Sequence, residues 1–346
     1  MQPVLEAVPN FSEGRDLRAV GALVDLIAAH DGVEVLDWSA DPDHHRAVVT
    51  YVGHPDDVAR ASVAAACWAR DHIDLTHHDG IHPRVGALDV LPFVPLAGLS
   101  MADAVAVSRR VGRALAAEGI PVFYYARSSR PPGRGLAELR RGGVEAFATG
   151  FPADRTPDEP AGALAPHPTA GVTCVGARPV LLAWNVYVEG VSHEDVRALA
   201  ASLRERGGGF PGLRALGLHL ERQGRLQVSM NLEDPARTSP MDVFRAIEAG
   251  VGARGGRVTG TEVIGMLPDA LVLPAAGDRL HLPDLGPARV LSTRVSQHLL
   301  TRVERDAEAL RHALTDAGER VPVGVREAAL RVIGGPRGTP TADDDS

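Results

Sequence analysis

The spacing of apolar and polar residues predicts alternating strands and helices in the first hundred residues. Apolar residues recur every three or four positions in LRAVGALVDLIAAH, residues 17–30, which is typical of an amphipathic helix. A second helix is predicted over residues 54–73, because a proline and two acids stand at its beginning. Runs rich in β-branched residues predict strands at residues 3–10, 33–38, 46–53 and 85–96. The resulting order is β-α-β-β-α-β.

The same order returns in the second half of the chain. Helices are predicted over residues 192–207, with Ser192 as the N-cap, and over residues 239–256. The predicted strands are residues 178–188, 213–221, 225–233 and 258–267. Each half therefore has the split β-α-β arrangement of ferredoxin-like domains. We predict an α+β protein with two ferredoxin-like subdomains, whose sheets carry helices on one side and pack together through the other.

The segments between and after these halves differ in composition. A helix is predicted over residues 101–119 and a strand over 121–126, followed by an irregular segment, rich in Pro, Gly and Arg, that extends to about residue 169. Such long loops are usually functional or disordered. A helical segment follows the second half, and the composition of the last residues predicts disorder. We predict an N-terminal subdomain over residues 1–174 and a C-terminal subdomain over residues 175–300. A helical segment at residues 301–334 and a tail at residues 335–346 follow.

Composition narrows the class of protein. The chain has 346 residues, and its 45% hydrophobic content is enough for a well-buried core. A net charge of −8 argues against a nucleic-acid partner. All 36 basic residues are arginines, which excludes lysine Schiff-base chemistry and suits bidentate binding of carboxylates.

Cellular location is predicted from the cysteines and the apolar stretches. Cys67 and Cys174 are the only cysteines, and both stand among apolar neighbours, which favours buried thiols in a reducing compartment. The N-terminus lacks the features of a signal peptide, and no apolar stretch is long enough to cross a bilayer. We expect a cytoplasmic protein without a membrane partner.

Histidines crowd into the stretch that precedes the strand at residues 85–96. His77, His78 and His82, with Asp79, are possible metal ligands, but the chain has neither an HExxH helix nor regular ligand spacing. As single residues, His77 and His78 are expected to be exposed. Arg84 follows two residues after His82 and lies on the same side of an extended chain. This pair suits a neutral imidazole base beside a cation that holds an anionic substrate.

Three motifs resemble the formiminotransferase family. They are VPNFSEGR, HPRVGALDVLPFVP and VGARPVLLAWNV, at residues 8–15, 82–95 and 175–186. The resemblance covers roughly residues 1–300. It implies transfer of a formimino group from N-formimino-L-glutamate to N5 of tetrahydrofolate, as in histidine degradation, by a homodimeric enzyme with a substrate tunnel. Tetrahydrofolate is then a co-substrate, no metal is needed, and the single-function form without a cyclodeaminase domain is expected.

The resemblance also implies roles for particular residues. His82, in the HPR motif, corresponds to the catalytic histidine and is expected to act as general acid and base. Arg84, and after it Arg46, are the candidate anchors for substrate carboxylates. Further candidates for substrate binding are Asn10, Ser12 and Asn185, each of which can instead satisfy local structure. The candidate folate contacts are Gly162, His167, Thr169 and Gly171.

Two positions depart from the family pattern and leave alternatives open. Ile81 stands where a Glu is common, and Ser39 stands where many members have an acid, so that Asp41 or Asp43 is the candidate to replace it. The donor can equally be formiminoglycine. A metal-dependent hydrolase using His77, Asp79 and His82, or a non-catalytic folate-binding relative, also fits the sequence.

Overall fold

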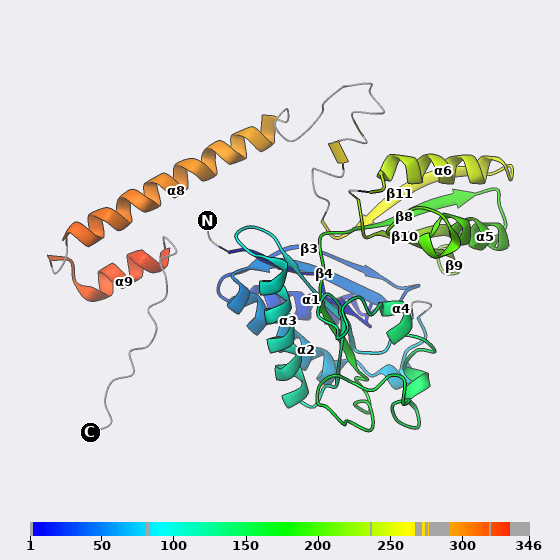
Figure 1. Ribbon diagram of the computed structural model, residues 1–346, viewed down its shortest axis with the longest axis horizontal. Coiled ribbons are helices and arrows are strands. Elements are labelled where there is room, and N and C mark those ends of the chain that lie inside the picture. Colours follow the sequence, from blue (N-terminus) through cyan, green and yellow to red (C-terminus); the bar gives the residue numbers. More distant parts are fainter. Residues whose placement is uncertain are drawn as a thin grey trace. The chain divides into compact units, whose positions relative to one another are not determined.

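The computed structural model divides the chain into two compact units, residues 1–271 and residues 272–346, which are described separately (Figure 1). The residues that the structure describes are 3–80, 83–235, 237–266, 272–273, 276, 291–317 and 320–332. The first unit contains helices and two separate sheets, which confirms the α+β class.

The first sheet has seven strands. β1 and β2 both lie between β4 and β5, β3 pairs with the far side of β4, and all of these pairs are antiparallel. β7 pairs in parallel with β5 and with β6. The strands are β1 (Leu5–Ala7), β2 (Asn10–Phe11), β3 (Val33–Asp41), β4 (Arg46–Gly53), β5 (Leu88–Pro95), β6 (Val122–Ala126) and β7 (Thr173–Ala177).

Three helices cover one face of this sheet and bury its apolar residues. They are α1 (Leu17–Ala28), α2 (Pro55–His72) and α3 (Met101–Ala117). Side chains alternate along β4, so Val49 and Tyr51 join the core, and the Tyr51 hydroxyl lies 2.7 Å from that of Ser62 on α2. Arg46 and Thr50 therefore belong to the face without helices. This face carries the polar residues discussed below.

The segment between β6 and β7 is more ordered than its composition predicts. It contains α4 (Leu136–Leu139) and a 3₁₀ turn at Val144–Phe147. Leu139 and Phe147 are fully buried, and they form a second core with Phe123 of β6 and Cys174 of β7. The segment thus covers part of the helix-free face. Burial of these few apolar side chains orders a stretch without regular periodicity.

The second sheet is antiparallel, in the order β11-β8-β10-β9. Its strands are β8 (Leu182–Glu189), β9 (Leu213–Leu220), β10 (Arg225–Leu232) and β11 (Arg257–Ile264), and its helices are α5 (His193–Leu203) and α6 (Pro240–Gly252). Ser192 caps α5 as predicted, with Asp195 completing a capping box. The helix ends at Leu203 and not at Gly207, because Arg204 is already extended. Trp184 and Val186 bury one face of the sheet against both helices.

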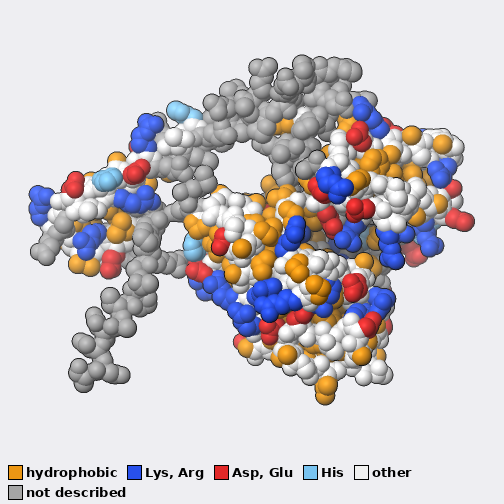
Figure 2. Space-filling view, in the orientation of Figure 1, with side chains coloured by type: hydrophobic (Ala, Val, Ile, Leu, Met, Phe, Trp, Pro, Cys, Tyr) orange, Lys and Arg blue, Asp and Glu red, His pale blue; other side chains and the backbone are white. Residues whose placement is uncertain are grey.

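The second unit contains α8 (Leu291–Ala317) and α9 (Val323–Val332). The predicted disordered tail, residues 335–346, lies outside the described residues. Within the described part of the chain, no helix has the length and apolarity needed to span a membrane. On the face drawn in Figure 2, arginine and carboxylate side chains are interspersed.

Candidate active site

The candidate site lies where the helix-free face of the first sheet meets the turn after β3. A narrow pocket lies there, whose side chains are packed so closely that about 170 Å³ of space between them, part of it open to solvent, has no room for a free water molecule. Its lining residues come from β4 and β5, from the loop after β2 and from both histidine-containing loops: Ser12, His44, His45, Arg46, His78, Arg84 and Asp89. Apart from Ser12 and Asp89, every one of these side chains is a histidine or an arginine.

The DPDHH turn forms one wall of the pocket. The Asp41 carboxylate accepts the backbone N–H groups of Asp43 and His44, at 2.8 Å each, and lies 3.0 Å from the His44 ring nitrogen Nδ1. Burial raises the pKa of Asp41, but the hydrogen bonds from His44 and its charge lower that pKa below the ordinary value. His45 has a positive φ of 49°, which is uncommon for a residue with a side chain. The turn places His44 and His45 at the pocket.

His45 and His78 stack, with ring centroids 4.2 Å apart. His78 Nδ1 accepts the N–H of Gly80 at 3.2 Å, so its Nε2 carries the proton and donates to the His45 carbonyl at 2.9 Å. Burial, together with nearby positive charge, lowers the pKa of His78 to about 4. His78 is therefore neutral at physiological pH. His77 is exposed, as predicted. The same prediction is wrong for His78, which is half-buried.

Carboxylates flank this histidine pair. Glu13 lies 3.3 Å from His45 Nε2 and accepts the backbone N–H groups of Arg15 and Asp16. The hydrogen bond from His45 and those from the backbone outweigh burial and lower the pKa of Glu13 to about 2. Asp79 pairs with the Arg15 guanidinium and lies 3.6 Å from His45 Nδ1. His45 thus stands between two carboxylates.

The predicted acid/base residue, His82, lies outside the described residues together with Ile81. Arg84, the candidate anchor, is described. It donates from Nη2 to the His78 carbonyl at 2.8 Å and to Glu145 at 3.0 Å, and its side chain is 12% exposed. Arg84 therefore already holds the loop that leads to the HPR motif.

Arg46 lies near the buried ion pair of Asp89 and Arg140. Asp89 is 2% exposed, accepts the N–H of Val85 at 2.8 Å and forms an ion pair with Arg140. Burial and the positive charge of Arg140 lower the pKa of Arg46 to about 10, which the charges of Asp41 and Asp89 oppose. Arg46 remains a cation at neutral pH. Asp89 is the one acid in the otherwise apolar strand LDVLPFVP, and this position is the signal in the sequence that could have predicted the pair.

Several predicted binding residues form hydrogen bonds with other groups of the protein. Asn10 donates to the Val8 carbonyl at 3.1 Å, and Ser12 donates to the Gly86 carbonyl at 2.7 Å. Asp43 is buried and accepts the N–H of Arg222 at 2.8 Å. Ser12 lines the pocket, and the direct substrate roles of all three residues stay predictions.

The candidate folate residues form a compact turn. His167 and Gly171 exchange backbone hydrogen bonds at 2.9 and 3.0 Å, and His167 Nδ1 accepts the N–H of Ala170 at 3.1 Å. The Thr169 carbonyl accepts the N–H of Leu75 at 2.9 Å. Gly171 has a φ of 67° and lies so close to the Val85 carbonyl that a Cβ atom would stand 2.2 Å from it. Gly162 also has a positive φ, of 81°.

The second sheet contributes Gln227 and Glu262, which no sequence pattern identified, as partners of His44 and of the candidate Asn185. Gln227 of β10 is fully buried, and its Nε2 lies 3.4 Å from His44 Nε2. Asn185 of β8 does not stand alone, because it donates to Glu262 of β11 at 3.2 Å. Contacts across 183 and 77 positions of sequence leave no local pattern that could have predicted them.

Two of the proposed metal ligands, His77 and Asp79, have other partners. His77 lies 3.2 Å from Asp74, and Asp79 pairs with Arg15. In the described ranges, no group of three His, Cys, Asp or Glu side chains is arranged to hold a metal ion. The Cys174 thiol is buried, which raises its pKa to about 12.

Comparison with known proteins gives consistent matches. Residues 4–178 match the formiminotransferase domain, N-terminal subdomain, and residues 183–280 match the formiminotransferase domain. The chain is 36% identical over 287 residues to a glutamate formimidoyltransferase of Streptococcus pyogenes serotype M1, which covers 82% of this chain and 95% of that protein. A glutamate formimidoyltransferase of Thermoplasma acidophilum is 31% identical, covering 85% and 98%. The formimidoyltransferase-cyclodeaminase of Sus scrofa is 36% identical, covering 80% and 52%.

Proposed function

Because the chain belongs to the formiminotransferase family, we propose that it transfers a formimino group from N-formimino-L-glutamate to N5 of tetrahydrofolate. The observation that carries this proposal is the similarity to two glutamate formimidoyltransferases along 95% and 98% of their lengths. Both matched subdomains are present, at residues 4–178 and 183–280.

The reaction needs a group that moves protons between two nitrogens. N5 of tetrahydrofolate attacks the amidine carbon, and a tetrahedral intermediate forms. N5 must lose a proton, and the amine of glutamate leaves well only when it gains one. We assign both transfers to His82, and such catalysis typically contributes ~10²–10⁴-fold. The resemblance of the HPR motif supports this assignment, as do the contacts of His78 and Arg84, which fix the loop on either side of that residue.

We propose that Arg84 and Arg46 hold the carboxylates of the donor. Both guanidinium groups line the pocket. The Nε atom of Arg84 is buried and has no hydrogen-bond partner among the described residues. A buried cation with an unused donor suits an anionic ligand. Asn10 and Ser12 are proposed to add hydrogen bonds to the substrate, and Ser12 lines the same pocket.

The proposed architecture is a pair of ferredoxin-like subdomains that enclose a tunnel between their sheets. The order β5-β1-β4-β3 in the first sheet is equivalent to β11-β8-β10-β9 in the second. Polar groups of the two halves approach each other: the backbone N–H of Arg222 donates to the Asp43 carboxylate, and Gln227 Nε2 lies 3.4 Å from His44 Nε2. The Thr50 hydroxyl and Gln227 Oε1 are buried and unpaired within the described part, which is the expected state of groups that line a ligand site.

The folate site is assigned to residues 162–171. The bridge between Gly171 and Gly86, which joins the His167–Gly171 turn to the segment after the HPR motif, supports this proposal. The proposed homodimer and cytoplasmic location rest on the family resemblance and on composition.

The direct test is an assay of the purified chain with tetrahydrofolate and either formiminoglutamate or formiminoglycine, run in parallel. Turnover with formiminoglutamate supports the proposal, and turnover with formiminoglycine alone changes the donor. The absence of turnover with both, in a chain that binds folate, indicates a non-catalytic relative. Activity that EDTA abolishes would favour a metal-dependent hydrolase.

His82→Ala should reduce turnover by about 10²–10⁴-fold while tetrahydrofolate still binds. Near-normal turnover of this variant contradicts the acid/base assignment. His77→Ala serves as the control, because His77 is exposed and contacts only neighbouring residues.

A further inference from the structure

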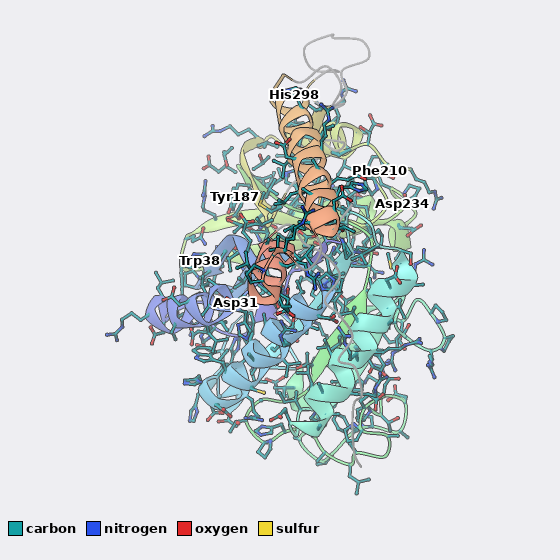
Figure 3. The ribbon with its side chains drawn as sticks, turned by 90° about the vertical axis from the view of Figure 1, so that its left-hand side faces the viewer. Asp31, Trp38, Tyr187, Phe210, Asp234 and His298 are labelled. Carbon is teal, nitrogen blue, oxygen red and sulfur yellow. The ribbon has the colours of Figure 1, made fainter. Side chains whose placement is uncertain are left out.

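A carboxylate on the second sheet is held by two neutral donors. Glu262 of β11 lies opposite Asn185 of β8 in the antiparallel register. Its Oε2 atom accepts the amide of Asn185 at 3.2 Å and the hydroxyl of Tyr187 at 2.7 Å. Figure 3 labels Tyr187. Burial and the bond to Glu262 both raise the pKa of Tyr187, so the hydroxyl keeps its proton and donates.

The charge of Glu262 is not neutralised by this arrangement. Neither the amide nor the phenol carries a positive charge, and both bonds go to the same oxygen, Oε2. Both hydrogen bonds described for Glu262 come from neutral groups, and Arg46 is the nearby cation whose pKa the Glu262 charge raises. A half-buried carboxylate that is held by two neutral donors on Oε2 can bind a cation through its other oxygen, Oε1.

The side-chain alternation of β8 shows which way this carboxylate faces. Trp184, Val186 and Val188 bury the helix-covered side, so Asn185 and Tyr187 belong to the opposite side. Gln227, the partner of Tyr187 in the register, lies beside His44 at the pocket. Glu262 is also close enough to Arg46 for its negative charge to support the protonated guanidinium. Glu262 therefore faces the same space as the pocket.

The donor in the proposed reaction is itself a cation at the reacting end. A formamidine is a strong base, so the formimino group carries a positive charge spread over two nitrogens at neutral pH. Its planar N–H groups match a carboxylate in the way that a guanidinium does.

On these grounds, and resting on the proposed function, we propose that Glu262 binds the amidinium of the formimino donor, with Asn185 and Tyr187 as positioning residues. The protonated amidine is the better electrophile. As the N5 electron pair forms the new N–C bond, the C=N π pair moves to the amidinium nitrogen, and the charge passes to N5 before its proton is removed. Glu262 thereby favours the reactive form of the donor and selects it by charge.

N-formylglutamate provides the discriminating probe, because it replaces the cationic nitrogen with a neutral oxygen at the same position. Binding of formiminoglutamate and N-formylglutamate is measured by calorimetry for wild type and Glu262→Gln. We expect wild type to prefer the cationic ligand, and Glu262→Gln to lose about 10- to 100-fold in affinity for it while affinity for N-formylglutamate changes less than about threefold.

The control is Glu189→Gln, which removes the same charge from the same strand as Asn185. Glu189 is exposed and pairs with Arg257 at 2.8 Å, so this variant should keep the wild-type preference. Tyr187→Phe keeps the ring and removes one donor, and it should lose part of the preference. This variant also tests the proposal if Glu262→Gln does not fold.

A structural role for Glu262 predicts a different result. If Glu262→Gln lowers the affinity for both ligands equally, or if wild type binds both with the same affinity, the proposal is wrong. Failure of the proposed function gives a result that differs from failure of this proposal. The wild-type chain would then still bind formiminoglutamate more tightly than N-formylglutamate, but it would transfer nothing to tetrahydrofolate.

Discussion

Asp89→Asn is the change whose effect on stability the structure predicts most directly. Asp89 is 2% exposed and pairs with Arg140, whose side chain is 13% exposed. The other Asp89 oxygen accepts the N–H of Val85 at 2.8 Å. Asparagine preserves this second bond but removes the charge, which leaves Arg140 buried without its counter-ion.

The magnitude follows from the burial of the pair. Removal of one partner of a buried ion pair typically costs about 3–5 kcal/mol. Because the bond to Val85 is retained, we expect a loss near the lower end, about 3 kcal/mol. For a unit of this size that corresponds to a decrease in Tm of roughly 6–12 °C. Arg46 increases the effect, since it adds a further positive charge close to Arg140.

Urea and thermal unfolding of three variants test this reasoning. Asp154→Asn is the matched control, because Asp154 pairs with Arg141 at a site where both side chains are about 60% exposed. Such a surface pair contributes about 0–1 kcal/mol. The double variant Asp89→Asn/Arg140→Met should recover at least about 1 kcal/mol relative to Asp89→Asn, because no unpaired charge remains. The reasoning is refuted if Asp89→Asn resembles Asp154→Asn, or if Arg140→Met adds its own loss without recovery.

Three further predictions concern the loops around the pocket. Arg84→Ala should raise KM for formiminoglutamate, and an unchanged KM removes Arg84 from the anchor role. The pKa of His78 is lowered to about 4, below its value in the unfolded chain. The contribution of His78 to stability is therefore present near neutral pH and is lost as the pH falls from about 6.5 toward 4. The stability of His78→Phe should depend less on pH over this range, and an unfolding free energy with the same pH dependence as wild type contradicts this. Gly171→Ala should destabilise the protein by more than about 1 kcal/mol, because φ is 67° and the new Cβ would meet the Val85 carbonyl, so an unchanged Tm would show that this turn relaxes easily.

The proposed site recognises charge at both ends of the donor. Arg84 and Arg46 line the pocket, whereas Glu262 accepts its hydrogen bonds from the neutral groups of Asn185 and Tyr187. A ligand with carboxylates at one end and an amidinium at the other fits such a division. The glycine and glutamate donors share the amidinium, so their discrimination depends on the arginines, and the Arg84 variant should alter the ratio of the two rates.

The sequence by itself determined the elements whose information is local. The strand at residues 46–53 coincides with β4, and Ser192 caps α5, because side-chain periodicity and capping chemistry act within a few residues. The α+β class and the repeated element order follow from the same local patterns. The motifs that resemble the formiminotransferase family are also short and contiguous.

Tertiary structure alone decided which distant residues meet. Phe147 orders a segment without periodicity, because its partner Phe123 lies on a strand of the first sheet. Gln227 approaches His44 across 183 positions, and Glu262 receives the hydroxyl of Tyr187 across 75. Such contacts arise from how the sheets pair and pack, and no periodicity in the chain records them. Hydrogen bonds and ion pairs depend on atoms within a few ångströms, which only the folded chain brings together.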